Sequence, residues 1–577
     1  MKNTHMQKTH QNDRNSTNST NNRNNRRAQS FEERGGLPST LRNVTGQGGT
    51  ALIAIVLALA LFSGMAGLSA LGADDFTGNP AAQIEGAPIE GVWEGKLVVG
   101  KSALSLVFNV FKTNQNGGYD ATMDSPDQGA KGIPVSKITV IGTRVLLEVK
   151  AVNGSYSGEL SADGTRMVGQ WQQSGMSLPL QLEKKPPLPE GKREQEQALT
   201  DKAAHQGAAP SSDSPYDEIE VRFPSLNIEF DAPDSQAPSG SHATVQDGTT
   251  RAGATQAGTA PVILAGTLTI PRGQGDGPFP AVVLVSGSGL QNRDEEIMGH
   301  KPFKAIADYL ALRGIAVLRY DDRGFGQSTG DASAATTFDF TRDACGALEF
   351  LAKTDGIDAK RLGVIGHSEG GIVAAIIAAQ QGQDLPKVSF IVMLAGPGVR
   401  GDELLLEQAR AIAKASGVTI EQTEMATALN SKLYSIAVKE TSIESRRQEI
   451  FELLKKEAPE LESQADGIAA QVLSPWVVQF LKLDPADYLR NITIPVLALN
   501  GTKDLQVPAA SNLPAIDEAL KEAGNTHYRL VALDGLNHLF QHAKTGLPNE
   551  YAQLQEDFAP EALALMGDWI RAVVDAR

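Results

Sequence analysis

The segment Leu362-Gly363-Val364-Ile365-Gly366-His367-Ser368-Glu369-Gly370-Gly371 decides the fold that this sequence predicts. A short apolar run ends at Ile365, and Ser368 follows in the pattern G-x-S-x-G. This pattern predicts that a buried strand ends, that the chain turns sharply, and that a helix begins. Glycines two residues before and after the serine leave room for a strained turn that exposes the hydroxyl. The segment therefore predicts a nucleophilic serine of the kind that serine hydrolases use.

The sequence on both sides of this segment alternates between apolar strands and helices. Strands are predicted at 281–285, 316–320, 362–365, 390–394, 496–500 and 528–533, and helices at 302–312, 338–351 and 558–574. Continuous apolar strands that alternate with helices are typical of a mostly parallel sheet covered on both faces. Residues 402–489 interrupt the alternation with an almost wholly helical pattern. The fold class is therefore α/β, with a helical cap inserted over the sheet.

A serine hydroxyl needs a histidine base before it can act as a nucleophile. Three histidines follow Ser368 in the chain: His527, His538 and His542. His538 follows a predicted strand directly, in a loop that can reach the end of the sheet where the serine lies. His527 begins that strand and lies at the opposite end. We predict His538 as the base, with His542 as the alternative.

The histidine needs a carboxylate to fix its tautomer, and in this type of fold the acid lies between serine and histidine in the chain. Asp504 follows the strand at 496–500, so we predict it as the acid, with Asp534 as the alternative. Two backbone N–H groups must also face the developing oxyanion. One is predicted from Glu369, directly after the nucleophile. The other is predicted from Ser288, in the glycine-rich loop after the strand at 281–285, with Gly289 next.

At these motifs the chain resembles bacterial α/β-hydrolases of the esterase and serine-aminopeptidase-like group. The matching pieces lie within residues 216–577 and comprise 286–295, 320–328, 366–371, 500–507 and 535–541. Residues 125–129, in an all-β region at 88–184, resemble the small N-terminal domain that some of these esterases carry. The resemblance implies cleavage of a carboxylic ester through an acyl-enzyme but does not fix the substrate; we predict esters of short acyl chains. Ser286 departs from the pattern, because many relatives have histidine before the oxyanion glycine.

Two other functions remain open from the sequence. A peptidase acting on short peptides would need acidic groups for a free amino terminus, and Glu403, Glu407, Glu421 and Glu424 are available in the cap. A catalytically silent surface protein, working through the all-β region, is the second. Neither the ester nor the peptide reaction implies a metal or an organic cofactor. The formal net charge of −16 argues against nucleic acid as a partner. The oligomeric state is not predicted.

The N-terminal region predicts transfer of the chain out of the cytoplasm. Residues 1–50 are polar and rich in asparagine, with eight Lys/Arg against three Asp/Glu, and are predicted to be disordered. Residues 51–73 are apolar and uncharged, which fits either a cleaved signal or a membrane anchor. The basic side comes first, so the remainder is predicted to be extracytoplasmic, anchored or secreted.

Two further segments complete the predicted organisation of the chain. Residues 88–184 alternate at period two, which predicts a small barrel or sandwich with a structural or docking role. Residues 185–215 are rich in proline, serine and charged residues and are predicted to be a linker. Residues 231–259 contain almost nothing to bury and are predicted to be a flexible insertion.

Overall fold

The computed structural model describes residues 89–185, 214–230 and 261–576, apart from short internal gaps. The gaps are residues 100–101, 113–118, 127–129, 136, 150–153, 162, 174–175, 229, 274, 276 and 381–386. The predicted tail, the apolar segment 51–73, nearly all of the linker and the insertion 231–259 lie outside the described residues. Within the described ranges, no helix combines the length and the apolar character needed to cross a bilayer.

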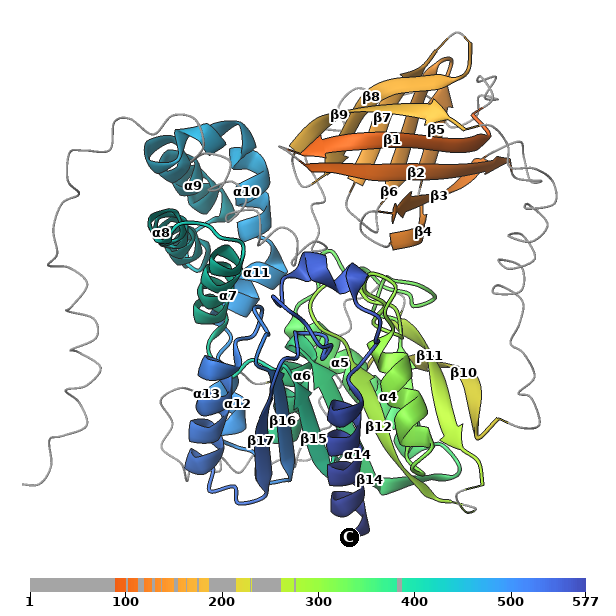
Figure 1. The fold of residues 1–577 in the computed structure, drawn as a ribbon, viewed down its shortest axis with the longest axis vertical. Coiled ribbons are helices and arrows are strands. Elements are labelled where there is room, and N and C mark those ends of the chain that lie inside the picture. The colour runs from red at the N-terminus through yellow and green to blue at the C-terminus, as the bar shows by residue number, and fades with distance from the viewer. Residues whose placement is uncertain are drawn as a thin grey trace, which may run out of the picture. The chain divides into compact units, whose positions relative to one another are not determined.

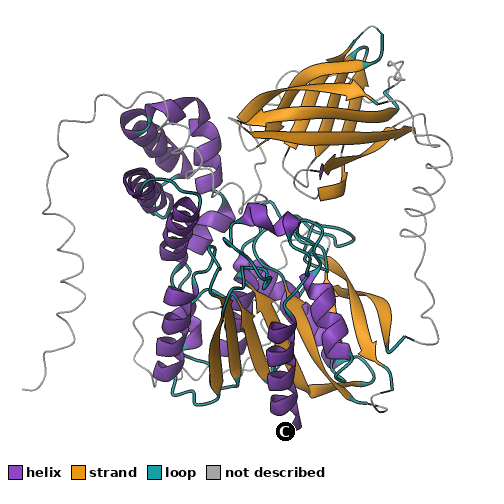
Figure 2. Ribbon diagram, viewed as in Figure 1, coloured by secondary structure: helices purple, strands orange, loops and turns teal. Residues whose placement is uncertain are grey.

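The all-β unit is one antiparallel sheet of nine strands, in the order β4-β3-β2-β1-β9-β8-β7-β6-β5. Figure 2 shows the sheet curling into a barrel-like shape, which is the first of the two predicted alternatives. The strands are β1 (Gly91–Val99), β2 (Ser102–Lys112), β3 (Tyr119–Ser125), β4 (Ala130–Pro134), β5 (Lys137–Ile141), β6 (Arg144–Val149), β7 (Gly154–Leu160), β8 (Arg166–Gln173) and β9 (Met176–Lys184).

Aromatic side chains fill the interior of this curled sheet. Trp93 and Trp171 are almost wholly buried, and the Phe108 ring lies 6.0 Å from Trp171 and 6.2 Å from Tyr156. Alternate residues of β2, β3 and β6 point inward, so the period-two pattern in the sequence becomes a single core. A Cβ atom on Gly154 would lie 2.3 Å from the Trp171 ring, so the glycine makes room for the indole.

The α/β unit contains an eight-stranded sheet in the order β10-β11-β13-β12-β14-β15-β16-β17. The first three strands in this order pair antiparallel, and the strands from β13 to β17 pair parallel. Their bounds are β10 (Tyr216–Pro224), β11 (Ile263–Pro271), β12 (Phe279–Val285), β13 (Ala316–Tyr320), β14 (Ile357–His367), β15 (Phe390–Leu394), β16 (Val496–Gly501) and β17 (Tyr528–Leu533).

Helices cover both faces of this sheet, and the alternation of side chains along β12 explains why. Val282 and Leu284 share a core with α4 (Pro302–Ala311) and α14 (Pro560–Asp575). Val283 and Val285 belong to the opposite core, with α5 (Thr337–Ala352), α6 (Glu369–Ala379) and α13 (Ala509–Glu522). A strand that is buried on both faces has no polar side to expose, which is why it appears as a continuous apolar run.

A group of helices is inserted between β15 and β16, where the sequence predicts a helical cap. Figure 1 shows α7 to α10 packed together as one group. The inserted elements are α7 (Gly401–Ala415), α8 (Ile420–Ala437), α9 (Ile443–Glu457), the 3-10 helix η3 (Pro459–Gln464), α10 (Ala465–Val472), α11 (Pro475–Lys482) and α12 (Pro485–Leu489). The core of this insertion is continuous with one core of the sheet.

Candidate active site

Ser368 lies at the turn between β14 and α6, as the sequence predicts. Its φ is +53° and its ψ is −119°, a backbone conformation that residues with a Cβ rarely adopt. A Cβ on Gly366 would lie 1.9 Å from the Gly370 carbonyl oxygen, and one on Gly370 would lie 2.2 Å from the Val285 carbonyl oxygen. The two glycines are therefore required by close packing of the turn against itself and against β12.

His538 and Asp504 form a buried pair. The His538 Nδ1 atom lies 2.9 Å from Asp504 Oδ2, and both side chains are almost inaccessible to solvent. The other carboxylate oxygen, Oδ1, accepts backbone N–H groups of Gln506 at 2.8 Å and Val507 at 2.9 Å. These bonds fix the carboxylate, and the carboxylate in turn leaves His538 Nε2 free to face a nucleophile.

The alternative acid and bases lie in different surroundings. His542 is exposed and faces two surface carboxylates, Glu556 at 2.8 Å and Glu561 at 2.9 Å. Asp534 is exposed and accepts a hydrogen bond from Thr502 at 3.0 Å. His527 directly precedes β17, at the end opposite to the His538 loop. None of these three is among the residues that line the cavity at Ser368.

The loop after β12 passes directly against the nucleophile. A Cβ on Gly287 would lie 3.0 Å from the Ser368 Cβ, which is tighter than ordinary packing, so a larger residue would push against the nucleophile. The Gly287 N–H is already committed to Glu295 Oε1, at 2.8 Å. That leaves the N–H groups of Ser288 and Gly289 as candidates from this loop, together with the N–H of Glu369 at the first position of α6. Ser288, Gly289 and Ser368 all line one cavity.

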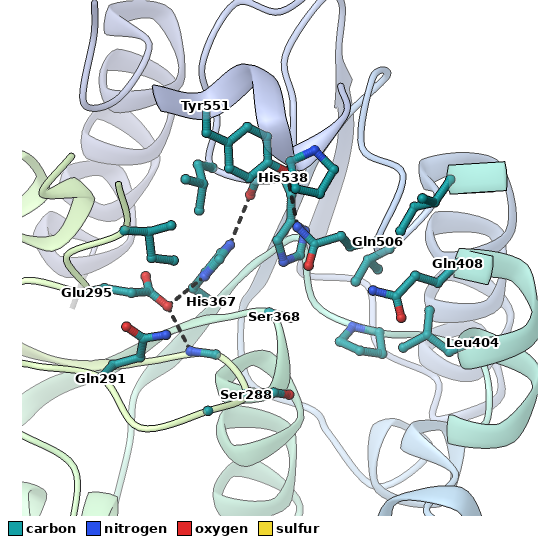
Figure 3. A pocket seen from close by; sticks show the side chains of 18 of the residues that line it. Ser288, Gln291, Glu295, His367, Ser368, Leu404, Gln408, Gln506, His538 and Tyr551 are labelled. Atoms are coloured by element: carbon teal, nitrogen blue, oxygen red, sulfur yellow. Dashed lines mark hydrogen bonds and ion pairs between the residues drawn. The ribbon is translucent and has the colours of Figure 1, made fainter. Parts of the chain in front are cut away.

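A second histidine–carboxylate pair lies behind the nucleophile, and the sequence analysis did not predict it. His367 Nδ1 lies 2.8 Å from Glu295 Oε1, and His367 Nε2 donates to the carbonyl oxygen of His538 at 2.9 Å. Figure 3 shows His367 between Glu295 and the His538 loop. Because Gly287 also donates to Glu295, the pair connects the oxyanion loop, the serine turn and the histidine loop.

Burial and the carboxylate act in opposite directions on His367. Burial favours the neutral ring, but the Glu295 carboxylate and the His538 carbonyl more than offset it, so the pKa of His367 is raised. The protonated ring donates from both nitrogens, which matches one acceptor on each side. No signal in the sequence joins these residues, because they lie 72 positions apart.

A polar turn after β13 holds the oxyanion loop from the other side. Asp322 accepts the Ser286 hydroxyl at 2.8 Å and the Gln291 N–H at 2.8 Å. Asp321 pairs with Arg293 at 2.9 Å. These contacts brace the oxyanion loop against the turn after β13. They also show what Ser286 does in place of histidine: it ties the start of the loop to Asp322.

The cavity at Ser368 has a volume of about 510 Å³ and a mainly apolar lining. The cap contributes Leu404, Leu405, Ile412, Trp476 and Phe480, and other loops contribute Ile297, Met298, Leu539, Leu547 and Tyr551. The ionisable residues on its lining are His538, His367, Glu295 and Tyr551. Across the described ranges, no group of three or more His, Cys, Asp or Glu side chains is placed to hold a metal ion.

Comparisons with known proteins agree with this architecture. Residues 300–544, which contain Ser368, Asp504 and His538, match the profile of the family described as serine aminopeptidase, S33. The chain is 30% identical to esterase EstD of Thermotoga maritima over 277 residues, which are 48% of this chain and 58% of EstD. An uncharacterised 31.7 kDa protein of Escherichia coli is 23% identical over 270 residues, 45% of this chain and 87% of that protein.

Solved structures were also matched. Esterase Pf2001 of Pyrococcus furiosus covers 63% of this chain and 95% of its own length, with 12% identity and a TM-score of 0.35. Est1E of Butyrivibrio proteoclasticus covers 55% and 95%, with 17% identity and a TM-score of 0.31. The sequence matches and the strand–turn–helix geometry at Ser368 show that the α/β unit of this chain has the α/β-hydrolase fold and is similar in sequence to the esterase and serine-aminopeptidase-like group.

Proposed function

We propose that the protein hydrolyses carboxylic esters through Ser368, His538 and Asp504. The observation that carries the proposal is the buried His538–Asp504 pair, at 2.9 Å, on the cavity that Ser368 also lines. Ser368 attacks the ester carbonyl while His538 takes its proton, and Asp504 holds the ring in the tautomer with the proton on Nδ1. His538 then returns the proton to the leaving alcohol, and water releases the acid from the acyl-enzyme by the same route.

The proposal places the oxyanion against two backbone donors. The N–H groups of Ser288 and Glu369 stabilise the negative charge of the tetrahedral intermediate. Ser288 is preferred to Gly287 because the Gly287 N–H already donates to Glu295. The apolar lining suits an uncharged acyl or alcohol group. The expected preference for short acyl chains stays a prediction.

Replacing the nucleophile tests the reaction. The Ser368→Ala variant should lower kcat for p-nitrophenyl acetate by about 10⁴-fold or more, because the oxyanion donors alone cannot form an acyl-enzyme. Far-ultraviolet circular dichroism of the variant should match the unsubstituted protein. Full esterase activity in a folded Ser368→Ala protein would exclude the proposed nucleophile.

A peptidase is the second candidate, because the matching family profile carries that description. The four cap glutamates that the sequence offered for a free amino terminus are absent from the cavity lining. Glu407 accepts a hydrogen bond from Ser511 at 2.6 Å, and Glu424 faces Arg410 at 3.7 Å. We therefore expect much higher kcat/KM for an acyl-nitrophenyl ester than for an aminoacyl-nitroanilide. The reverse order would favour the peptidase.

A further inference from the structure

Glu369 has a second feature besides its backbone N–H: its side chain is a buried carboxyl group shared by three separate segments. The residue is 2% exposed. Its Oε1 accepts the Thr337 hydroxyl of α5 at 2.6 Å. The Trp476 indole N–H of the cap helix α11 donates to Oε1 at 2.9 Å and Oε2 at 3.1 Å. The Ser288 side chain of the oxyanion loop also acts on this carboxyl group and helps to lower its pKa.

No cation compensates the charge that this carboxyl group could carry. Within the described ranges, Glu369 forms no ion pair with a lysine, arginine or histidine. Burial raises the pKa of Glu369, and the side chains of Thr337, Trp476 and Ser288 oppose that effect only in part. A buried acid without a counter-ion is costly to keep, and the serine turn does not require it, since only the glycines around it are sterically forced. Its contacts therefore point to a role in the site.

Trp476 connects this carboxyl group to the place where substrate binds. Its ring lines the cavity and stacks on Phe480, with the ring centres 4.9 Å apart and the planes at 18°. Its one polar atom is bonded to Glu369. An acyl chain that packs on the Trp476–Phe480 pair therefore presses on a ring whose orientation is set by the same group that holds Ser288.

We propose that Glu369 is a positioning residue that couples the cap to the oxyanion hole. The carboxyl group holds Trp476 on one side and the Ser288 hydroxyl on the other, so occupancy of the cap side of the cavity adjusts the loop that carries the Ser288 N–H. Contact of the acyl group with Trp476 then changes kcat as well as binding. This inference rests on the proposed ester hydrolysis and adds to it a route by which the acyl group affects the chemical step.

A double-mutant cycle tests the coupling. Ser288→Ala and Trp476→Phe each remove a side-chain contact with Glu369. Ser288→Ala keeps the backbone N–H of residue 288, and Trp476→Phe keeps an aromatic ring at position 476. With p-nitrophenyl octanoate, the product of the two single effects on kcat should differ from the double-variant effect by roughly fivefold. With p-nitrophenyl acetate, whose acyl group offers only one methyl group to the cap, the two single effects should multiply. Single effects on kcat that simply multiply with octanoate, which means additivity in free energy, overturn the proposal.

The same cycle in two Glu369 backgrounds shows whether this residue carries the coupling. In Glu369→Leu, the octanoate effects should become additive, and a remaining non-additivity would overturn the proposal. Glu369→Gln keeps an acceptor for the indole N–H, so the non-additivity should return; additive effects there would also contradict the proposal. If Glu369→Leu does not fold, the cycles in the unsubstituted chain and in Glu369→Gln remain decisive.

Two controls separate this inference from its basis. The first control is Lys482→Met. Lys482 lies on the same helix as Trp476, but it is exposed and pairs with Glu440 at 2.6 Å. The effect of Lys482→Met on the activation free energy should be additive with that of Ser288→Ala. If Lys482→Met is as non-additive with Ser288→Ala as Trp476→Phe is, then any change in α11 reaches the loop, which contradicts a route through Glu369. In every variant, the rate is taken as the Ser368-dependent activity, which is the part that disappears when Ser368→Ala is added. Activity that survives Ser368→Ala contradicts the proposed function, whereas additivity of Ser368-dependent activity contradicts the coupling alone.

Discussion

Two histidine–carboxylate pairs meet at Ser368, and their geometry suits them to different tasks. His538 uses only Nδ1 for Asp504, which leaves Nε2 for proton transfer. His367 uses both nitrogens, one for Glu295 and one for the His538 carbonyl. A ring with both nitrogens committed cannot accept a proton from the nucleophile. The His367–Glu295 pair therefore acts by holding loops in place.

Removing the Glu295 charge should loosen those loops. Glu295→Gln keeps an oxygen for the Gly287 N–H but removes the attraction for His367. We expect kcat to fall roughly tenfold with a smaller change in KM, because small displacements of catalytic groups cost rate more than binding. The neighbouring Glu296→Gln is the control, since Glu296 pairs with Lys301 near the surface, at 3.3 Å. Equal losses in both variants would contradict the account.

The same substitution should change how stability depends on pH. The pKa of His367 is raised in the folded protein, so its stabilising effect is complete below the unfolded value of 6.5. That effect is lost as pH rises through the folded pKa. The difference in free energy of unfolding between the unsubstituted protein and Glu295→Gln should therefore shrink as the pH rises above about 6.5, the unfolded value. A difference that grows over this range, measured by urea unfolding, would contradict the assigned pair.

Sequence order was sufficient to predict that Ser368, Asp504 and His538 lie at one edge of the sheet, because each follows a strand and parallel strands end at the same edge. The order of residues in the chain cannot reveal pairs such as Glu295 and His367, which meet only when the chain is folded. Trp476 and Glu369 lie 107 positions apart for the same reason. The positioning residues thus became visible only with side-chain contacts.

The elements of the sheet differ in how closely the sequence predicts them. The strands predicted at 316–320, 390–394 and 528–533 match β13, β15 and β17 to the residue. Strand direction carries no such signal, so the antiparallel pairing of β11 with β13 was not predicted. Nor was α13 predicted, a helix that contains Pro514 and starts in a polar segment. An apolar run in the sequence predicts that a strand is buried, but it predicts neither the direction of that strand nor the strands beside it.

The close contact between α6 and β12 limits which residues the serine turn can contain. Gly370→Ala would place a methyl group 2.2 Å from the Val285 carbonyl oxygen, which is backbone and cannot rotate away. We expect a loss of about 3 kcal/mol in the free energy of unfolding and a loss of activity. Gly417→Ala is the matched control, because its φ is +75° but no atom lies within 4 Å of the added carbon. It should cost only about 1 kcal/mol.

Thermal or urea unfolding of the two glycine variants gives the comparison directly. Similar costs at positions 370 and 417 would mean that the contact with the Val285 carbonyl oxygen is relieved easily, and that the tight packing of α6 on β12 does not position Ser368. A stable Gly370→Ala protein with full activity would have the same meaning.

At the scale of the whole molecule, the location of the protein remains a prediction. Residues 51–73 lie outside the described residues, and we propose that they carry the catalytic unit out of the cytoplasm. The full-length chain produced in a bacterium should be found in the membrane or extracytoplasmic fraction. Protease added to spheroplasts should digest the α/β unit. Protection from that protease in intact spheroplasts, with loss of protection on lysis, would contradict this orientation.

The central claim is that Ser368 forms a covalent acyl-enzyme on this α/β-hydrolase unit, and active-site labelling tests it most directly. The protein is incubated with a fluorophosphonate, and intact-mass and peptide mass spectrometry then locate the adduct. The account predicts one adduct per chain, on Ser368, with loss of ester hydrolysis in proportion to labelling and no adduct in Ser368→Ala. Labelling at another residue, or full activity in the labelled protein, would contradict it.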